Sequence, residues 1–313
     1  MRIADSPEQI LTPTAIALGN FDGIHRGHQK VLQPILQLSH HDSHRSYPTV
    51  VSFSPHPREF FTGEQLTLLT PVAEKAQLLS EMGIKQLVLI PFNQKLASLS
   101  PQEFVAEIIV KQLQAIAISV GEDFCFGYRR QGTAKDLVAI ASKYGIEVQI
   151  NSLQQYQYQQ HHHHGEVRIS SSLIRKALET GDIPHANYML GRAYSLTGTV
   201  VQGQQIGRTI GFPTANLQLP PNKFLPRYGV YAVNVSYDRS KIRGVMNIGC
   251  RPTVDGINPA IEVHLLDWSG DLYGQTLTVS LEKFLRPEQK FPSLEALKQQ
   301  ITADCQAARI MDF

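Results

Sequence analysis

Two histidines and three glycines gather in residues 19–28, which read G-N-F-D-G-I-H-R-G-H. The imidazoles of His25 and His28 can donate hydrogen bonds to phosphate oxygens, and Gly23 leaves room for a phosphate to approach the backbone. An H-x-x-H spacing alone also fits a metal site or surface histidines in a turn. The metal alternative is weaker because neither a cysteine nor a pair of carboxylates lies beside the histidines.

The segments on either side predict that residues 19–28 form a strand-to-helix turn. Residues 14–18 are an apolar run typical of a buried strand, and residues 31–38 have helical spacing. Parallel α/β sheets bind their ligands beyond the carboxyl ends of the strands, and a helix N-terminus attracts anions. The pattern therefore predicts a phosphate site at this turn.

The rest of the first half alternates strands with helices. We predict strands at 50–53, 87–91, 115–120 and 147–150, with helices at 70–82, 100–112 and 136–144 between them. His56 follows the first of these strands in S-P-H-P-R, where two prolines fix the backbone. The loop either displays one imidazole to a site or is a simple connection.

Two later stretches of the first half could also contact a nucleotide. Residues 121–132 read G-E-D-F-C-F-G-Y-R-R-Q-G and place an acid, aromatic rings and arginines after a predicted strand. A flat ring and phosphates would suit them, although core packing of the two phenylalanines is the simpler interpretation. Residues 167–175 read V-R-I-S-S-S-L-I-R, and a serine-rich helix start followed by Arg175 could hold an anion as well as cap the helix.

The second half changes to period-two alternation with Gly/Pro turns, which predicts a small β-barrel. Expected strands include 195–201, 230–237, 261–266 and 277–281, followed by a helix at 295–308. Residues 203–216 read G-Q-Q-I-G-R-T-I-G-F-P-T-A-N, a glycine-rich loop that could lie close to phosphates but is not a Walker A loop. The oxygens of Thr214 and Asn216, two residues apart on one strand face, suit Mg²⁺.

Glu262 stands out in the strand I-E-V-H-L-L-D. It alternates with Ile261 and Val263, so we expect its carboxylate to face the barrel interior or mouth. Taking a proton from a substrate hydroxyl and forming a buried salt bridge are equally good explanations.

Composition sets outer limits on the function. The chain has 313 residues, enough for two domains, with 42% apolar and 18% charged residues. A net charge of +2 gives no electrostatic case for a nucleic-acid partner, and neither a bilayer-spanning apolar run nor a signal-peptide core is evident. Three dispersed cysteines, Cys125, Cys250 and Cys305, favour free thiols in a reducing cytoplasm.

Taken together, these motifs resemble a known family. The segments G-N-F-D-G-I-H-R-G-H, S-P-H-P-R, G-E-D-F-C-F-G and I-S-S-S-L-I-R resemble the adenylyltransferase module of prokaryotic bifunctional riboflavin kinases/FMN adenylyltransferases, or FAD synthetases. The segments G-R-T-I-G-F-P-T-A-N, N-I-G-C-R-P-T, E-V-H-L-L-D and L-R-P-E-Q-K-F are similar to the kinase module. The resemblance implies an α/β fold: a Rossmann-like nucleotidyltransferase domain over residues 1–183, then a β-barrel riboflavin kinase domain with a terminal helix over 184–313.

The resemblance also implies site residues. Glu262 would be the kinase base, and His25, His28 and Arg175 would be catalytic in the first domain. The remaining positions form four groups: ATP phosphates in the first domain (Gly19, Phe21, Asp22, Gly23, Ser171, Ser172), flavin in the first domain (His56, Pro57, Asp123, Phe124, Arg129), ATP in the second domain (Gly203, Gly207, Arg208, Gly211, Pro213, Thr214, Asn216) and flavin in the second domain (Arg286, Glu288, Phe291). Thr214 and Asn216 would bind Mg²⁺.

The implied function is phosphorylation of riboflavin by ATP to FMN, followed by adenylylation of FMN to FAD in the cytoplasm by a monomer or weak homo-oligomer. Two alternatives remain: a kinase whose first domain only binds nucleotide, and a non-catalytic flavin- or nucleotide-responsive regulator. The sequence departs from the family pattern at Ser54, usually acidic, at Ser172 and Cys250, usually threonine, and at Asp123, asparagine in some members. The histidine run 161–164 has no counterpart in the family.

Overall fold

The computed structural model describes residues 1–41, 46–152, 155–157, 166–203, 207, 210–238, 240–253 and 256–311. The histidine run 161–164 and Arg208 lie outside these residues. The chain forms two compact units, Met1–Ser171 and Ser172–Phe313. The helices α7 (Ser171–Thr180) and α8 (Ile183–Leu190) thus belong, after Ser171, to the second unit. The domain boundary expected between residues 183 and 184 stays a prediction.

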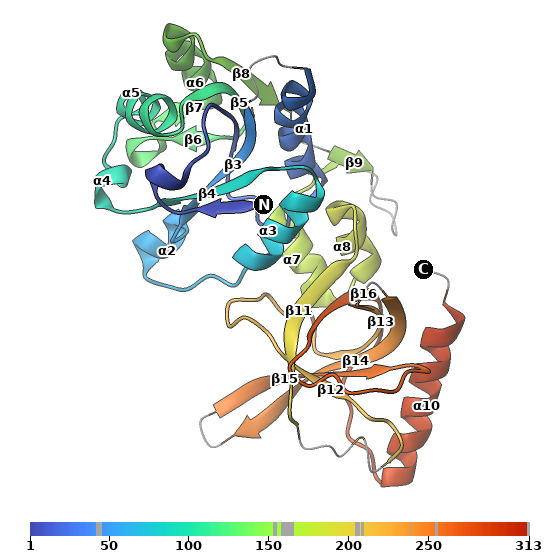
Figure 1. Ribbon diagram of the computed structural model, residues 1–313. Helices are drawn as coiled ribbons and strands as arrows, with labels where there is room; N and C mark the ends of the chain where they lie inside the picture. Colours follow the sequence, from blue (N-terminus) through green and yellow to red (C-terminus); the bar gives the residue numbers. More distant parts are fainter. Residues whose placement is uncertain are drawn as a thin grey trace. The chain divides into compact units, whose positions relative to one another are not determined.

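The first unit is built on a parallel sheet of six strands in the order β1-β4-β3-β2-β5-β8 (Figure 1). Its strands are β1 (Arg2–Ala4), β2 (Thr14–Leu18), β3 (Tyr47–Ser54), β4 (Gln86–Pro91), β5 (Ala115–Gly121) and β8 (Glu147–Asn151). The strand order reverses at β2, which pairs with both β3 and β5. The loops after β2 and β5 therefore flank the crevice in which such sheets bind ligands. The predicted Rossmann-like sheet is confirmed.

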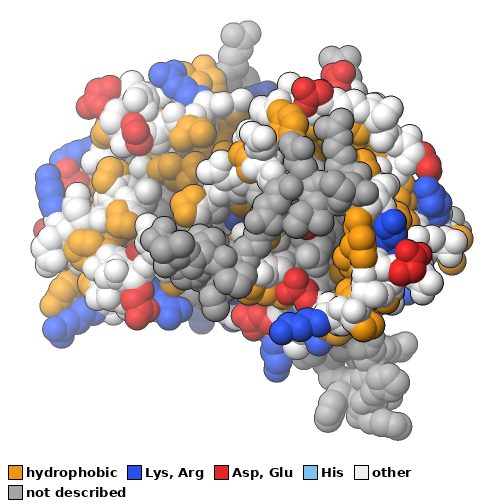
Figure 2. All heavy atoms as spheres, turned by 90° about the horizontal axis from the view of Figure 1, so that it is seen from below, with side chains coloured by type: hydrophobic (Ala, Val, Ile, Leu, Met, Phe, Trp, Pro, Cys, Tyr) orange, Lys and Arg blue, Asp and Glu red, His pale blue; other side chains and the backbone are white. Residues whose placement is uncertain are grey.

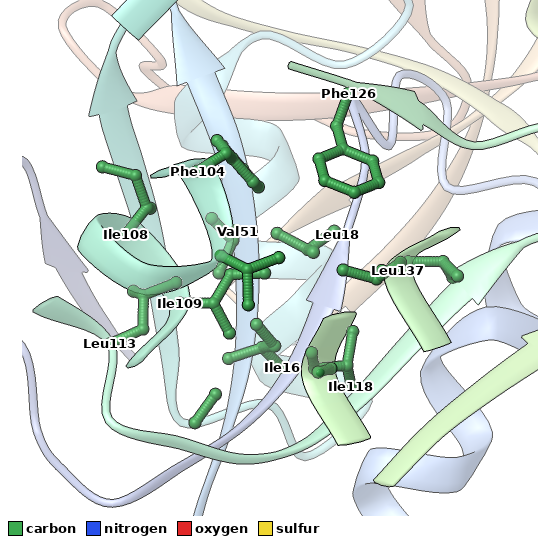
Figure 3. Packing of buried hydrophobic residues seen from close by; sticks show 14 of the residues in the cluster. Ile16, Leu18, Val51, Phe104, Ile108, Ile109, Leu113, Ile118, Phe126 and Leu137 are labelled. Atoms are coloured by element: carbon green, nitrogen blue, oxygen red, sulfur yellow. The ribbon is translucent and has the colours of Figure 1, made fainter. Parts of the chain in front are cut away.

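Both faces of β2 are buried, because alternate residues of a strand point to opposite sides of the sheet. Ala15 and Ala17 pack with α1 (Arg26–His41) and α3 (Val72–Glu81). Ile16 and Leu18 face the other core, which Figure 3 shows together with residues of the π-helix Phe104–Gln112 and of α6 (Ala134–Ala141). Burial on both faces explains why the strand is a continuous apolar run, as is usual in parallel sheets.

Shorter elements complete the first unit. The helices are α2 (Pro57–Thr62), α4 (Gln94–Ala97) and α5 (Pro101–Glu103), with 3₁₀ turns at Pro7–Gln9, Tyr128–Arg130 and Ser142–Tyr144. Two small antiparallel pairs join β6 (Cys125–Phe126) to β7 (Gly132–Thr133), and β9 (Gln155–Gln157) to β10 (Glu166–Arg168).

The second unit contains a closed barrel in the order β11-β12-β15-β14-β13-β16. Its strands are β11 (Tyr194–Val201), β12 (Ala215–Gln218), β13 (Gly229–Tyr237), β14 (Ser240–Thr253), β15 (Gly256–Leu265) and β16 (Thr276–Arg286). Alternate side chains, such as Leu196, Val233 and Met246, are fully buried and fill the interior. The predicted barrel is confirmed.

The terminal helix α10 (Leu294–Ile310) covers β13 and β14 from outside the barrel (Figure 1). Its residues Cys305 and Ala308 are buried against Val230, Ala232 and Val245. These three strand residues alternate with the interior ones, so both faces of β13 and β14 are apolar near the helix. The terminal helix expected from the sequence is confirmed.

Charged side chains of both signs are interspersed on the face of the molecule shown in Figure 2, with hydrophobic ones between them. This mixture agrees with the small net charge of +2. Among the residues that the structure describes, no helix has the length and apolar character needed to cross a membrane.

Candidate active sites

The imidazole rings of His25 and His28 stack at the start of α1, with centroids 3.6 Å apart and planes 15° apart. The backbone N–H of His28 donates to Nδ1 of His25 over 3.2 Å. An Nδ1 that accepts a hydrogen bond leaves the proton of a neutral ring on Nε2. The ring of Phe21 packs 5.2 Å from that of His28. The two predicted histidines are therefore brought together in one fixed arrangement.

The backbone between β2 and α1 has a conformation that L-residues rarely adopt. Phe21 and Ile24 have φ angles of +49° and +42°, and Gly23 has +88°. Left-handed φ values on non-glycine residues each cost on the order of 1 to 3 kcal/mol. The side chains of Phe21 and Ile24 are only 1% exposed, and their burial in the α1 core offsets that cost.

Polar groups from outside the turn hold its backbone. Nζ of Lys75 donates to the Asn20 carbonyl over 2.7 Å, and Oγ of Ser171 donates to the Asp22 carbonyl over 2.8 Å. Thr70 accepts from the Gly23 N–H through its hydroxyl and donates its own N–H to the Asp22 carboxylate. Asp22 thus organises the turn, and its carboxylate is 8% exposed. Thr70 and Lys75 were not identified from the sequence, where residues 70–82 only indicated a helix.

The remaining residues of the first predicted ATP group divide between the two units. Gly19 continues the pairing of β2, since its N–H donates to the Val51 carbonyl over 3.2 Å. Ser172 and Arg175 belong to the second unit. There the guanidinium carbon of Arg175 lies 5.5 Å from the centre of the Phe224 ring. Its action on ATP in the first domain stays a prediction.

His56 has a structural task at the start of α2. Its Nδ1 accepts from the Arg58 N–H over 3.0 Å, and its own N–H donates to the Glu59 carboxylate over 2.9 Å. This reciprocal pair is a capping box. It places Pro57 at the first position of the helix, where the missing N–H costs nothing.

Beside His56 lies an aromatic group that the sequence did not single out. Phe60 and Phe61 of α2 pack edge-on against Phe92, with ring centroids 5.3 and 5.8 Å away, and Phe53 joins from β3 at 5.8 Å. Phe61 is 70% exposed. An aromatic side chain this exposed at the ligand-binding edge of the sheet can pack against a flat ring. Sequence spacing gives no sign of it, because Phe92 comes from a different strand end.

The loop after β5 places its predicted flavin residues in different surroundings. Asp123 forms an ion pair with Arg168 of β10. Phe124 stacks on Phe126, 5.7 Å between centroids, and packs against the core, as the simpler interpretation expected. Arg129 has a left-handed φ of +49° and holds its guanidinium carbon 5.1 Å from the Tyr128 ring centre. Their contact with flavin stays a prediction.

In the barrel, three polar residues from three adjacent strands lie in direct register. Asn216 of β12 and Asn247 of β14 both pair with Glu262 of β15. Their strand neighbours, among them Val263 and Met246, are fully buried inside the barrel. Glu262 therefore points away from the interior, which corrects the expectation of an interior position, whereas a position at the barrel mouth stays a prediction. The period-two pattern shows that neighbouring residues face opposite sides, but not which side is inside. Asn247 was missed because cross-strand register is invisible in the sequence.

Two described residues near the ends of the segment before β12, Gly203 and Pro213, lie close to this row. Nδ1 of His264 donates to the Pro213 carbonyl over 2.7 Å. This hydrogen bond links the peptide group that precedes Thr214 to β15. Gly203 lies so close to Asn216 that a Cβ there would meet the amide nitrogen at 2.2 Å. Only glycine permits this approach. Gly207 and Gly211 follow in the same loop, the latter with φ +89°.

The residues predicted to contact flavin in the second domain are held by specific contacts. Arg286 forms a bidentate ion pair with Asp304 of α10, with Nη2 2.8 Å from Oδ2, and its guanidinium carbon is 5.6 Å from the Phe291 ring centre. The Glu288 carboxylate lies against Gly249, where a Cβ would meet its oxygen at 2.0 Å. Burial, the neighbouring Cys250 and the Glu288 charge together raise the pKa of Tyr228. The segment is thereby anchored both to α10 and to β14.

The metal alternative for His25 and His28 gains no support. Within the described ranges, no three His, Cys, Asp or Glu side chains gather as a metal site would require. A magnesium site in the barrel would use other ligands, namely the oxygens of Thr214 and Asn216. Those hard oxygens, next to the Glu262 carboxylate and a glycine backbone, fit a hydrated Mg²⁺ carrying phosphates.

The two units correspond to two family models. Residues 8–172 match the model described as FAD synthetase, and residues 190–311 match the model described as riboflavin kinase. Together with the fold and the two sets of polar residues, these matches define a two-module protein of flavin-nucleotide synthesis.

Similar proteins carry both modules. Those from Escherichia coli strain K12 and Pseudomonas fluorescens, each named bifunctional riboflavin kinase/FMN adenylyltransferase, are 41% identical over 94% of this chain and 91% of their own. A crystal structure from Streptococcus pneumoniae, described as a macrolide-efflux protein, has a TM-score of 0.85 and 32% identity over 99% of both chains. The chain belongs to the family of bifunctional riboflavin kinases/FMN adenylyltransferases. The resemblance found in the sequence is confirmed.

Proposed function

We propose that this chain converts riboflavin to FMN in its barrel unit and FMN to FAD in its parallel α/β unit, with ATP as the co-substrate of both steps. The observation that carries the proposal is that each matched module brings its own reactive side chains together. These are the His25–His28 stack in one unit and the Asn216–Glu262–Asn247 row in the other. A kinase whose first module only binds nucleotide has less support, because His25 and His28 are stacked and hydrogen-bonded at the start of α1.

For the kinase step, Glu262 takes the proton of the riboflavin 5′-hydroxyl. The freed oxygen attacks the γ-phosphorus of ATP, and the bond from that phosphorus to the bridging oxygen of ADP breaks. Phosphoryl transfer depends mainly on positioning and charge stabilisation. The register of Glu262 with Asn216 supports this role, since it places the base next to the proposed ATP loop.

Mg²⁺ belongs to this proposal, with Thr214 and Asn216 as its protein ligands. When bound, it neutralises charge on the ATP phosphates. The contact from Pro213 to His264 supports a fixed position for Thr214, and the absence of a side chain at Gly203 allows its backbone to approach the Asn216 amide. Arg286, Glu288 and Phe291 would close over the flavin from the side of α10.

For the adenylyl step, an oxygen of the FMN phosphate attacks the α-phosphorus of ATP. The bond to the bridging oxygen breaks, and pyrophosphate leaves. The phosphate nucleophile is already ionised, so the site needs donors to the developing charge more than a base. His25 and His28 supply such donors at the N-terminus of α1, where backbone N–H groups also attract anions.

The flavin in this unit would pack on Phe61, which is 70% exposed beside His56. The residues Asp123 and Arg129 belong to the loop after β5, on the other side of β2 from β3. We further propose a cytoplasmic protein that works as a monomer or weak homo-oligomer. The three free cysteines support a reducing compartment.

A single assay tests the proposal. Purified protein is incubated with riboflavin and Mg-ATP, and FMN, FAD and pyrophosphate are followed by chromatography. FMN should appear first and FAD later, and EDTA should stop FMN formation. FMN without FAD would favour a first module that only binds nucleotide, and tight flavin binding without either product would favour a regulator.

A further inference from the structure

A lysine is buried next to the turn 19–28 that carries the two histidines. The side chain of Lys75 in α3 is 6% exposed. Its Nζ lies 2.7 Å from the carbonyl oxygen of Asn20, the second residue of the turn. Lysine is almost never fully buried unless it is paired. The position therefore calls for an explanation.

Within the described part of the chain, Lys75 forms no direct ion pair with a carboxylate. The carboxylate whose charge acts on Lys75 is that of Asp22, which accepts a hydrogen bond from the N–H of Thr70. Burial lowers the pKa of Lys75, and the charge of Asp22 opposes that shift. Keeping an ammonium group in such a place costs folding free energy, which a neutral residue of similar size would avoid.

The contact to Asn20 orients one peptide group. In a trans peptide the C=O and the following N–H point in opposite directions. With the Asn20 carbonyl held towards Lys75, the N–H of Phe21 points to the opposite side of the turn. That N–H donates to no acceptor in the part of the chain that the structure describes. The lysine thus holds the carbonyl oxygen, which would repel a phosphate, towards the protein interior. The N–H, which would attract a phosphate, then points outward.

We propose that Lys75 is a positioning residue for adenylyl transfer, holding the Asn20–Phe21 peptide so that the turn presents donors, and no acceptor, to the ATP phosphates. The proposal rests on the adenylyltransferase activity proposed above. Phe21 has a left-handed φ of +49°, so this peptide needs an anchor to keep its orientation. A hydrogen bond to a charged donor is stronger than a neutral one and also polarises the peptide it binds.

Three variants test the role of Lys75. Lys75→Met keeps the length of the side chain and removes its charge and donors. Lys75→Ala removes a fragment that n-propylammonium can replace. Lys85→Met, at an exposed lysine just beyond α3, is the matched control. FAD formation from FMN and FMN formation from riboflavin are measured in the same samples, so the kinase unit serves as an internal standard for folding and concentration.

We expect Lys75→Met to lower kcat for FAD formation on the order of 10- to 100-fold, the effect of a small displacement of catalytic donors. KM for FMN should change less than about twofold, because Lys75 is buried and its Nζ is engaged with the Asn20 carbonyl. In Lys75→Ala, n-propylammonium should restore a large part of kcat, whereas n-propanol, which fills the same space without a charge, should not. Lys85→Met should behave like the unaltered protein.

Two results would overturn the inference. One is a kcat for FAD formation in Lys75→Met within threefold of the unaltered protein. The other is equal rescue by n-propanol and n-propylammonium, which would reduce Lys75 to a space-filling residue. If the unaltered protein makes no FAD from FMN and ATP at all, the proposed function itself fails, and that outcome is separate from both.

Discussion

The His25 and His28 rings are stacked 3.6 Å apart, and the backbone of one is hydrogen-bonded to the ring of the other. The pair therefore acts as one rigid donor surface. His28→Ala should lower kcat for FAD formation about 100-fold, the usual loss for one donor to a developing oxyanion. FMN formation by the same protein should be unchanged. Paired assays with FMN and with riboflavin check this. Equal loss of both activities would refute the assignment of one reaction to each unit.

Glu262 should behave in the opposite way. Glu262→Gln keeps the shape of the side chain and removes the base, so FMN formation should fall about 100-fold or more. Adenylylation of added FMN should persist. Glu295→Gln, in the exposed first turn of α10, is the matched control and should have no effect. A Glu262→Gln protein with normal FMN formation would leave the carboxylate without a catalytic role.

Phe61 offers a test of the flavin surface in the first unit. Removing one ring from a stacked arrangement costs about 0.5 to 1.5 kcal/mol, so Phe61→Ala should raise KM for FMN about two- to tenfold. Its effect on kcat should be small. Tyr144→Ala removes another exposed ring of the same unit, 48% exposed, and should leave KM unchanged. Steady-state kinetics at varied FMN concentration separate the two constants.

The burial of Cys305, on the face of α10 that packs against the barrel, makes the barrel unit sensitive to alkaline pH. Burial raises the pKa of this thiol from its usual 9.0 to about 11. Between these two values the unfolded chain releases the proton and the folded unit keeps it, so its contribution to stability is complete below pH 9 and declines as the pH rises. Urea unfolding of the second unit at pH 8 and 10.5 should show this decline. Cys305→Ala should reduce it, whereas Cys250→Ala, at an exposed thiol, should not.

The sequence predicted the features that depend on local pattern. The strand from Thr14 to Leu18, the turn with its two histidines and the period-two barrel strands all leave a mark in adjacent residues. The structure confirms these elements and extends several of them, such as β16, which continues to Arg286.

The residues that the sequence did not reveal owe their position to long-range packing. Lys75 is buried because α3 returns against β2, and Asn247 meets Glu262 because β14 and β15 pair in one register. For His56 the sequence left open a displayed imidazole or a simple connection, and it did not indicate that the ring nitrogen caps α2. A single sequence gives residue types and spacing, but it does not give the neighbours that tertiary structure supplies.

The register of β12, β14 and β15 makes the barrel site vulnerable to a kind of change that replaces none of the site residues. Because strand side chains alternate with period two, a one-residue insertion inside β15 before Glu262 would turn its carboxylate into the apolar interior and bring Ile261 or Val263 outward. A substitution alters one group, whereas such an insertion would dismantle the whole row. Length variation in this unit should therefore be confined to its connecting loops.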